Sequence, residues 1–411
     1  MKVCMFHLMP YRDLPADFDQ RYRSAYIDPV WFDVADPDKV GQYYNWTLDE
    51  LIYAANAGMH GLCTNQHHQN VYGFMANPSL MGSVLARATQ GQNVAIIQIG
   101  STLPSTSPPT RIAEEYGLLD CLSGGRLVAG FPRGLPTDAT ISNGVVPIDQ
   151  RERFDEALAL TLKAWSAREI FAWNGTHYQL PMVNLWPRPI QQPHPPIWIP
   201  GSSPTTVEYV TERDFCFAHL SYAGAKNAET LGDYYWEAVT KKGRDANPYR
   251  LTFLQLVGVS ETDAAAEEYA PHVEYFYHKL LYIPPYYQAI PGHQDYPSMM
   301  RQFKAPLRDR PDTHAMRYKD FVDRGFVITG SPATVRDQLV EAVKRLRIGH
   351  LLTLLHFGSM PHELCLQNID LFTREVLPAL EGLWDDEWED RWWPERLRAP
   401  RSVPAAAGGE S

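Results

Sequence analysis

Residues 118–134, LLDCLSGGRLVAGFPRG, constrain the fold of this chain more than any other stretch. Their pattern predicts a helix that ends at a Ser-Gly-Gly turn, an apolar strand over residues 127–131 and then a Pro-Arg-Gly loop. In a chain that alternates strands with helices, ligands bind beyond the carboxyl ends of the strands. The segment therefore places Arg133 at such an edge, where its planar guanidinium matches a phosphate or a carboxylate. An arginine in an ordinary surface loop is the alternative interpretation.

The alternation of strand and helix signals extends over most of the sequence. Continuous apolar runs such as residues 94–99 predict strands that are covered on both faces, as in parallel sheets. Asn-Pro and Ser-Pro pairs at Pro78, Pro204 and Pro332 predict the starts of helices. About eight strands in this order indicate the α/β class, and a closed (β/α)8 TIM barrel fits their number better than an open sheet. An open dinucleotide-binding sheet would carry Gly-x-Gly-x-x-Gly after its first strand, where this chain has MPYRDLP.

Two regions interrupt the alternation. Residues 9–46 predict a long aromatic and polar loop, after which Thr47 is expected to cap a helix with Glu50 at the capping-box position. Residues 265–315, rich in Tyr, His and Pro, predict an insertion near the ligand, at the carboxyl-terminal face of the barrel. Aromatic side chains in these regions either line an apolar substrate pocket or pack the long loops. They are Trp31, Tyr43, Tyr44 and Trp46, and Tyr275, Tyr277, Tyr282, Tyr286 and Tyr287.

Length, composition and charge limit the classes of protein to which this chain can belong. The 411 residues, 45% of them hydrophobic, supply a large core, so a barrel domain is expected over residues 1–385 and a partly disordered tail over residues 386–411. The net charge of −11 argues against a nucleic-acid partner, and no apolar run is long enough to span a membrane. Five scattered cysteines without a CxxC pair indicate reduced thiols, and the first residues resemble a strand rather than a signal peptide. We therefore expect a cytoplasmic protein.

Two adjacent histidines follow the predicted second strand. Neighbouring residues of an extended chain point to opposite sides, so one of His67 and His68 is expected to face a pocket. Histidine titrates near neutrality and can donate, accept or transfer a proton there. Two histidines held by loop backbone groups are the alternative. A metal site is disfavoured, because adjacent histidines ligate one ion poorly and no HExxH motif or third ligand at standard spacing appears.

A hydroxyl-rich helix start provides a second candidate site. Gly201, Ser202 and Ser203 stand between a predicted strand and a predicted helix, where backbone N–H groups, hydroxyls and the helix dipole suit a phosphate. A plain serine N-cap explains the same residues. With Arg133 at another strand end of one barrel, the two elements would face a single anion.

The end of the third predicted strand provides a third candidate. It reads Gln98, Ile99, Gly100 and Ser101, and its glycine permits close approach of the backbone to a flat ligand. This signal is weak by itself.

These segments together resemble the bacterial luciferase-like family of flavin-dependent monooxygenases. The resemblance extends over residues 1–380 and rests on NQHHQN, PPTRIAEEYGLLDCLSGGRLVAGFPRG, PRPIQQPHPPIWIPGSS and TGSPATVRDQL in that order. It implies a (β/α)8 barrel that binds reduced FMN, which a separate flavin reductase supplies. Dioxygen then adds to the flavin, and the resulting flavin peroxide oxygenates a small organic substrate. It also implies a homodimer or a higher homo-oligomer.

The resemblance assigns roles by motif position. His67 takes the place of the catalytic histidine, with Gln66 and His68 beside it. A non-proline cis peptide is implied at residues 99–101, against the flavin ring, and Arg133 and Ser202 are implied to hold the flavin phosphate. The implied cofactor-binding residues are Gln98, Gly100, Ser101, Arg133, Gly201, Ser202 and Ser203.

This chain departs from the family pattern at two positions. Gln66 stands where the family usually has a glutamate, so the neighbouring histidine is expected to lack a carboxylate that would favour its charged form, unless the glutamate is mainly structural. Pro132 replaces a small or thiol residue before the arginine and changes the wall that faces the flavin.

Two other functions remain open. One is a deazaflavin-dependent oxidoreductase that transfers hydride on the same fold, and the other is a non-catalytic flavin-binding protein. The histidine pair favours the monooxygenase, and the aromatic insertion and His67 count against the non-catalytic alternative.

Overall fold

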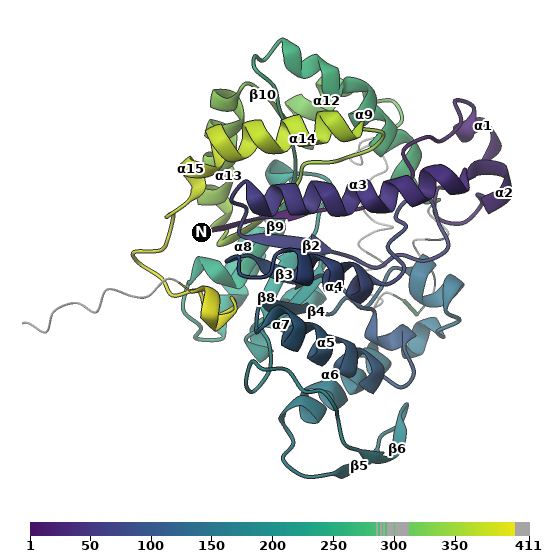
Figure 1. Cartoon of the computed structure of the whole chain (residues 1–411), viewed down its shortest axis with the longest axis vertical. Coiled ribbons are helices and arrows are strands. Elements are labelled where there is room, and N and C mark those ends of the chain that lie inside the picture. The colour runs from purple at the N-terminus through teal and green to yellow at the C-terminus, as the bar shows by residue number, and fades with distance from the viewer. Residues whose placement is uncertain (285–286, 288–289, 291, 294–299, 301–311, 399–411) are drawn as a thin grey trace, which may run out of the picture.

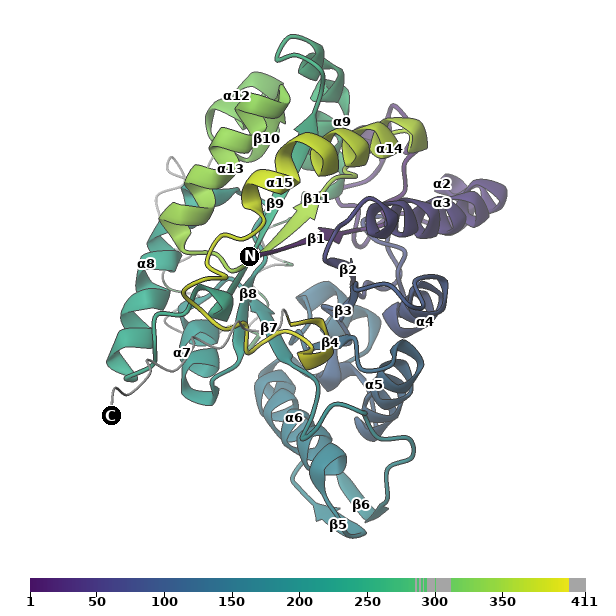
Figure 2. The same ribbon diagram turned by 60° about the vertical axis from the view of Figure 1, so that its left-hand side comes forward.

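The computed structural model describes residues 1–411 except 285–286, 288–289, 291, 294–299, 301–311 and 399–411. Parallel strands form a closed ring that is surrounded by helices (Figure 1, Figure 2). The strands of the ring are β1 (Lys2–Phe6), β2 (Gly61–Thr64), β3 (Ala95–Gln98), β4 (Leu127–Gly130), β7 (Ile197–Gly201), β8 (Cys216–His219), β9 (Leu251–Val259) and β11 (His350–Leu354). They follow one another in that order, and β11 pairs with β1 to close the ring. The predicted (β/α)8 barrel is therefore confirmed.

Each strand of the ring is followed by a helix on the outside of the barrel. The helices are α3 (Pro37–Asn56), α4 (Pro78–Ala88), α5 (Thr110–Ser123), α6 (Gln150–Ser166), α7 (Pro204–Arg213), α8 (Ala225–Lys241), α13 (Pro332–Leu346) and α14 (His362–Leu371). Among the described residues, no helix combines the length and the apolar character needed to cross a bilayer.

Other elements decorate the ring. A hairpin after α6 is formed by β5 (Phe171–Asn174) and β6 (Gln179–Val183) and lies away from the barrel (Figure 1). An additional strand, β10 (Val327–Gly330), extends the sheet beside the carboxyl end of β9. The short helices are α1 (Phe18–Arg21), α2 (Trp31–Val34), α9 (Ala270–Tyr275), α12 (Tyr318–Asp323) and α15 (Leu377–Leu380).

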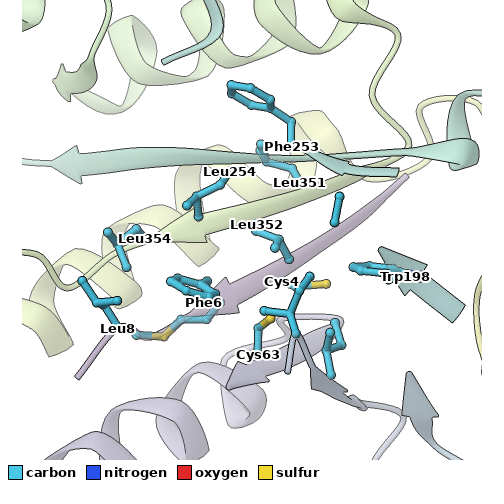
Figure 3. Close-up of a cluster of buried hydrophobic side chains, with 14 of the residues drawn as sticks. Cys4, Phe6, Leu8, Cys63, Trp198, Phe253, Leu254, Leu351, Leu352 and Leu354 are labelled. Carbon is cyan, nitrogen blue, oxygen red and sulfur yellow. The ribbon is translucent and has the colours of Figure 1, made fainter. Parts of the chain in front are cut away.

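The core of the barrel is built from alternate residues of its strands. Cys4 pairs in register with Leu352, and the next inward residues, Phe6 and Leu354, lie beside each other in the interior (Figure 3). The residues between them are equally buried because helices cover the outer face of the strands. This two-sided burial explains why the strands read as continuous apolar runs in the sequence.

Helix α3 begins earlier than the sequence pattern predicts. Pro37 is its first residue, and the Asp36 side chain caps it by accepting a hydrogen bond from the Asp38 N–H at 3.0 Å. Thr47 is a buried residue inside this helix, so the predicted cap at Thr47 and the capping box with Glu50 are wrong. Part of residues 9–46, predicted as a loop, is therefore helix.

Glu50 has a structural role instead of a capping role. Its buried carboxylate accepts hydrogen bonds from the Arg12 guanidinium at 3.1 Å, from His7 at 2.7 Å and from His362 at 2.9 Å. Burial by itself would raise the pKa of Glu50, but His356, His362, His7 and Arg12 outweigh that effect and hold it well below its usual range. The cluster fixes α3 and α14 against the loop that follows β1.

The insertion packs against loops at the same face as the strand ends. The Tyr275 hydroxyl donates to the Tyr11 carbonyl at 2.8 Å, and the Tyr277 hydroxyl donates to the Tyr222 carbonyl at 2.6 Å. At these positions the aromatic side chains pack loops, which favours the second of the two interpretations for them. Much of the predicted insertion, including Tyr286, lies outside the described residues.

The C-terminal segment closes the opposite end of the barrel, although residues 386–411 were predicted to form a partly disordered tail. Trp393 is 1% exposed, and its ring stacks on His350 at a centroid distance of 5.5 Å. The Trp198 indole N–H donates to the Trp392 carbonyl at 3.0 Å, and His350 pairs with Asp390 at 3.0 Å. In Figure 2 this segment, drawn in yellow, passes across the strand starts near β7 and β8. Asp390, Trp392 and Trp393 of the predicted tail thus pack on the barrel, and residues 399–411 lie outside the described residues.

Candidate active site at the carboxyl ends of the strands

An arginine and a helix N-terminus lie on one edge of the barrel. Strands β4 and β7 are neighbours, and the Phe131 N–H donates to the Trp198 carbonyl at 3.0 Å. Arg133 follows β4, and Ser203 follows β7 and caps α7, where its hydroxyl accepts from the Thr206 N–H at 3.3 Å. Ser202, between Gly201 and Ser203, is exposed at this edge. The predicted residues Arg133, Gly201, Ser202 and Ser203 are thus brought to one edge.

The electrostatics of this edge favour an anion. The Gln150 side chain donates to the Arg133 carbonyl at 2.7 Å and fixes the loop after β4. Burial, together with the positive charges of Arg133 and Arg151, lowers the pKa of His293 to about 4. The N-terminus of α7 adds the positive end of a helix dipole. A phosphate bound here would therefore meet a guanidinium, backbone N–H groups and serine hydroxyls.

The end of β3 approaches the end of β4 very closely. The peptide bond between Ile99 and Gly100 is cis. A Cβ atom at Gly100 would overlap the Gly130 carbonyl oxygen, so only glycine fits at this position. The Tyr116 hydroxyl accepts from the Ser101 N–H at 2.9 Å and donates to the Gly130 carbonyl at 3.1 Å. A bare stretch of backbone is thereby fixed at the barrel mouth, where a flat ligand could rest on it.

Gln98, the fourth residue expected at this strand end, does not face the mouth. Its side chain lies outside the ring against Gly82 of α4, and a Cβ atom at Gly82 would overlap its amide. Both amide atoms are buried and have no hydrogen-bond partner among the described residues. The Gln98 side chain is therefore corrected from a cofactor contact to a residue of the strand–helix interface, because its position in β3 points outward.

His67 is held by a carboxylate that comes from a different loop. Its Nδ1 lies 2.9 Å from Asp138 Oδ2, and Asp138 lies in the helical turn Pro136–Ser142 that follows β4. His67 is 13% exposed, and in the described part of the chain its Nε2 has no hydrogen-bond partner. The expectation that Gln66 leaves this histidine without a carboxylate is thus wrong.

Gln66 and His68 support the site in different ways. The side-chain Oε1 of Gln66 accepts a hydrogen bond from the Thr102 N–H at 2.7 Å, which ties the loop after β2 to the loop after β3. The His68 N–H donates to Asp138 Oδ1 at 2.9 Å, whereas its imidazole has no hydrogen-bond partner among the described residues. Burial lowers the pKa of His68, and the nearby Asp138 only partly opposes this. Of the two histidines, His67 carries the interaction suited to proton transfer.

Tyrosines cover the mouth. Tyr72 follows β2 and Tyr222 follows β8, strands on opposite sides of the ring, and the Tyr72 hydroxyl donates to the Tyr222 hydroxyl at 2.6 Å. Tyr26 stacks on Tyr72 with a centroid distance of 4.4 Å, and Tyr72 meets the His67 ring edge to face at 4.8 Å. This cover limits the access of water to His67.

The sequence analysis missed Asp138, Tyr72 and Tyr222. Asp138 stands in a polar segment just beyond Arg133, at a strand end of the kind that concentrates functional residues, and that position was the available signal. No local pattern marked the two tyrosines. No group of three or more His, Cys, Asp or Glu side chains within the described ranges is arranged to hold a metal ion.

The fold and the mouth define a (β/α)8-barrel protein with an arginine and a helix N-terminus on one edge and a histidine–carboxylate pair beside them. The sequence pattern of luciferase-like monooxygenases matches residues 32–348. The chain therefore belongs to the luciferase-like monooxygenase family and is a flavin-dependent oxidoreductase.

Individual relatives are distant. The flavin-dependent trigonelline monooxygenase, oxygenase component, of Acinetobacter baylyi is 24% identical over 248 residues, which are 59% of this chain and 67% of that protein. The oxygenating constituent of 3,6-diketocamphane monooxygenase from Pseudomonas putida, solved with FMN, superposes with a TM-score of 0.69 at 19% identity, over 92% of this chain and 98% of that one. An F420-dependent secondary alcohol dehydrogenase superposes with a TM-score of 0.63 at 16% identity, over 93% and 99% of the two chains. Such structural likeness shows the fold alone.

Proposed function

We propose that the chain is the oxygenase component of an FMN-dependent two-component monooxygenase that acts on a small organic substrate. The observation that carries this proposal is the placement of Arg133 and the α7 N-terminus on one edge of the mouth that also holds His67 and Asp138. The names of relatives support it, since one is an oxygenase component and another was solved with FMN. A separate flavin reductase, dioxygen, a homo-oligomer and a cytoplasmic location belong to the same proposal.

The residues at the mouth fit a flavin mononucleotide. Arg133, Ser202 and Ser203 would hold its phosphate, and the backbone of Gly100 and Ser101, which bears no large side chain, would lie against its flat ring. Bound reduced flavin would supply the electrons that activate dioxygen. His67 would hold or move a proton at Nε2, and the tyrosine cover would exclude water.

A deazaflavin-dependent hydride transfer is the second candidate function. The observation that favours it is the fold, which is shared with an F420-dependent alcohol dehydrogenase. An arginine with a helix N-terminus would suit the phosphate of either cofactor. Anaerobic titration with reduced FMN and with reduced deazaflavin separates the two. Tighter binding of FMN, followed by delayed return of oxidised-flavin absorbance on mixing with oxygen, supports the monooxygenase. Tighter binding of the deazaflavin, without oxygen uptake, overturns it.

Replacing Arg133 by alanine is expected to weaken FMN binding by about 10- to 100-fold, because a charge-assisted hydrogen bond to phosphate contributes roughly 1.5–3 kcal/mol. Riboflavin, which lacks the phosphate, should bind the variant and the wild type almost equally. Fluorescence titration with both flavins measures the difference. An equal loss of affinity for both would remove Arg133 from the phosphate site.

A further inference from the structure

We propose that Asp138 is a positioning residue that fixes a proton on Nδ1 of His67, so that Nε2 becomes the atom that exchanges protons at the mouth. The inference rests on the proposed function only in giving His67 a catalytic role. The geometry on which it depends belongs to the chain itself.

Both carboxylate oxygens of Asp138 are occupied. Oδ2 lies 2.9 Å from His67 Nδ1, and Oδ1 accepts from the His68 N–H at 2.9 Å and from the Asn70 side-chain amide at 3.5 Å. An ionised carboxylate only accepts hydrogen bonds, so Nδ1 must be the donor in this contact. With the Nδ1 proton fixed, the neutral imidazole keeps its lone pair on Nε2.

The neighbouring residues hold both Asp138 and His67 in place. Asp138 is 2% exposed, and its own carbonyl accepts from the Asn143 side chain at 2.6 Å. On the other side of the imidazole, a Cβ atom at Gly73 would lie 2.9 Å from the His67 ring, and Tyr72 closes the ring edge. A ring flip would put Cδ2 where Nδ1 now lies, so it would remove the hydrogen bond to Asp138.

The carboxylate that serves His67 therefore comes from the loop after β4 and not from the preceding residue. Gln66 is neutral and is engaged with the Thr102 N–H. The loop that carries Arg133 also carries Asp138, so one loop shapes both the anion edge and the protonation of His67.

Asp138→Asn should reverse the tautomer of His67. The His68 N–H keeps an oxygen at the Oδ1 position, so the amide nitrogen of the substituted side chain takes the place of Oδ2 and points its hydrogens at Nδ1. Nδ1 then becomes the acceptor and the proton moves to Nε2. The same logic explains the loss of activity when the orienting aspartate of a serine protease triad becomes asparagine.

The test is nitrogen NMR on flavin-free protein with labelled histidine, at a pH where the imidazole is neutral. The proposal expects the Nδ1–H form of His67 in the wild type and the Nε2–H form in Asp138→Asn. Asp120→Asn is the matched control, because Asp120 is also fully buried and hydrogen-bonded but holds Gln191 instead of a histidine. His67 should stay in the Nδ1–H form in that control.

If Asp138→Asn does not fold, the wild-type spectrum still tests the proposal. An Nε2–H form of His67 in the wild type overturns it. The same tautomer in wild type and folded Asp138→Asn also overturns it. Because no flavin, oxygen or substrate is present, the tautomer result stands even if the chain proves not to be a monooxygenase. With flavin, Asp138→Asn should lower kcat by about 10²-fold or more while FMN affinity stays close to that of the wild type.

Discussion

Replacing His67 by alanine is expected to lower the rate of the proposed oxygenation by about 10²- to 10⁴-fold, the usual contribution of a positioned acid–base group. The reason is that His67 places a free Nε2 at the mouth while Asp138 holds its other nitrogen at 2.9 Å. FMN affinity should change little, because the phosphate edge is formed by Arg133 and the start of α7. Oxygen uptake and product formation, measured at saturating reduced FMN, give the rates.

His68→Ala is the matched control for this prediction. It removes the adjacent imidazole, which has no hydrogen-bond partner among the described residues, and it keeps the backbone N–H that binds Asp138. The control should retain most of the activity. Equal losses of activity in the two variants would show that activity depends on the loop and not on the His67 imidazole. Unchanged activity in His67→Ala would show that His67 takes no part in the reaction.

Replacing Trp393 by alanine destabilises the fold by about 3–5 kcal/mol, as expected when a buried tryptophan leaves a cavity. The Trp393 side chain is buried between His350 and Trp198 at the amino-terminal end of the barrel, far from the mouth. Its loss also weakens the attachment of the C-terminal segment, which contributes the Asp390 partner of His350. Urea unfolding followed by circular dichroism measures the change in the free energy of unfolding.

Trp186→Ala is the control for this second prediction. Trp186 is 78% exposed, so its removal from the surface should change the free energy of unfolding by less than about 0.5 kcal/mol. If Trp393→Ala unfolds at the same urea concentration as the wild type, the C-terminal segment does not stabilise the barrel. FMN affinity of the folded Trp393→Ala protein should be unchanged, because the mouth lies at the other end of the strands.

Local signals in the sequence account for much of the fold. Helix α4 begins at Pro78 as predicted, and Ser203 and Ser331 cap the helices that begin at Pro204 and Pro332, because each capping hydrogen bond joins atoms close together in the chain. The start of α3 was misjudged because a Thr-x-x-Glu pattern inside a helix looks the same as a capping box at its end.

The sequence alone determined three features, because periodicity and helix caps act over a few residues. They are the alternation of strands and helices, the strand-end position of Arg133 and the serine at the start of α7. The tertiary structure decided the rest of the site. Asp138 and His67 are 71 residues apart in the chain, and the parallel pairing of β2 and β4 with β3 brings the loops after β2 and β4 to the same edge of the barrel. The sequence could not show whether Gln98 faces the mouth or a helix. Both faces of a parallel strand are buried, so the residues of β3 do not alternate between polar and apolar. The ordering of Trp393 likewise depends on its packing against His350 and Trp198, which come together only in the folded barrel.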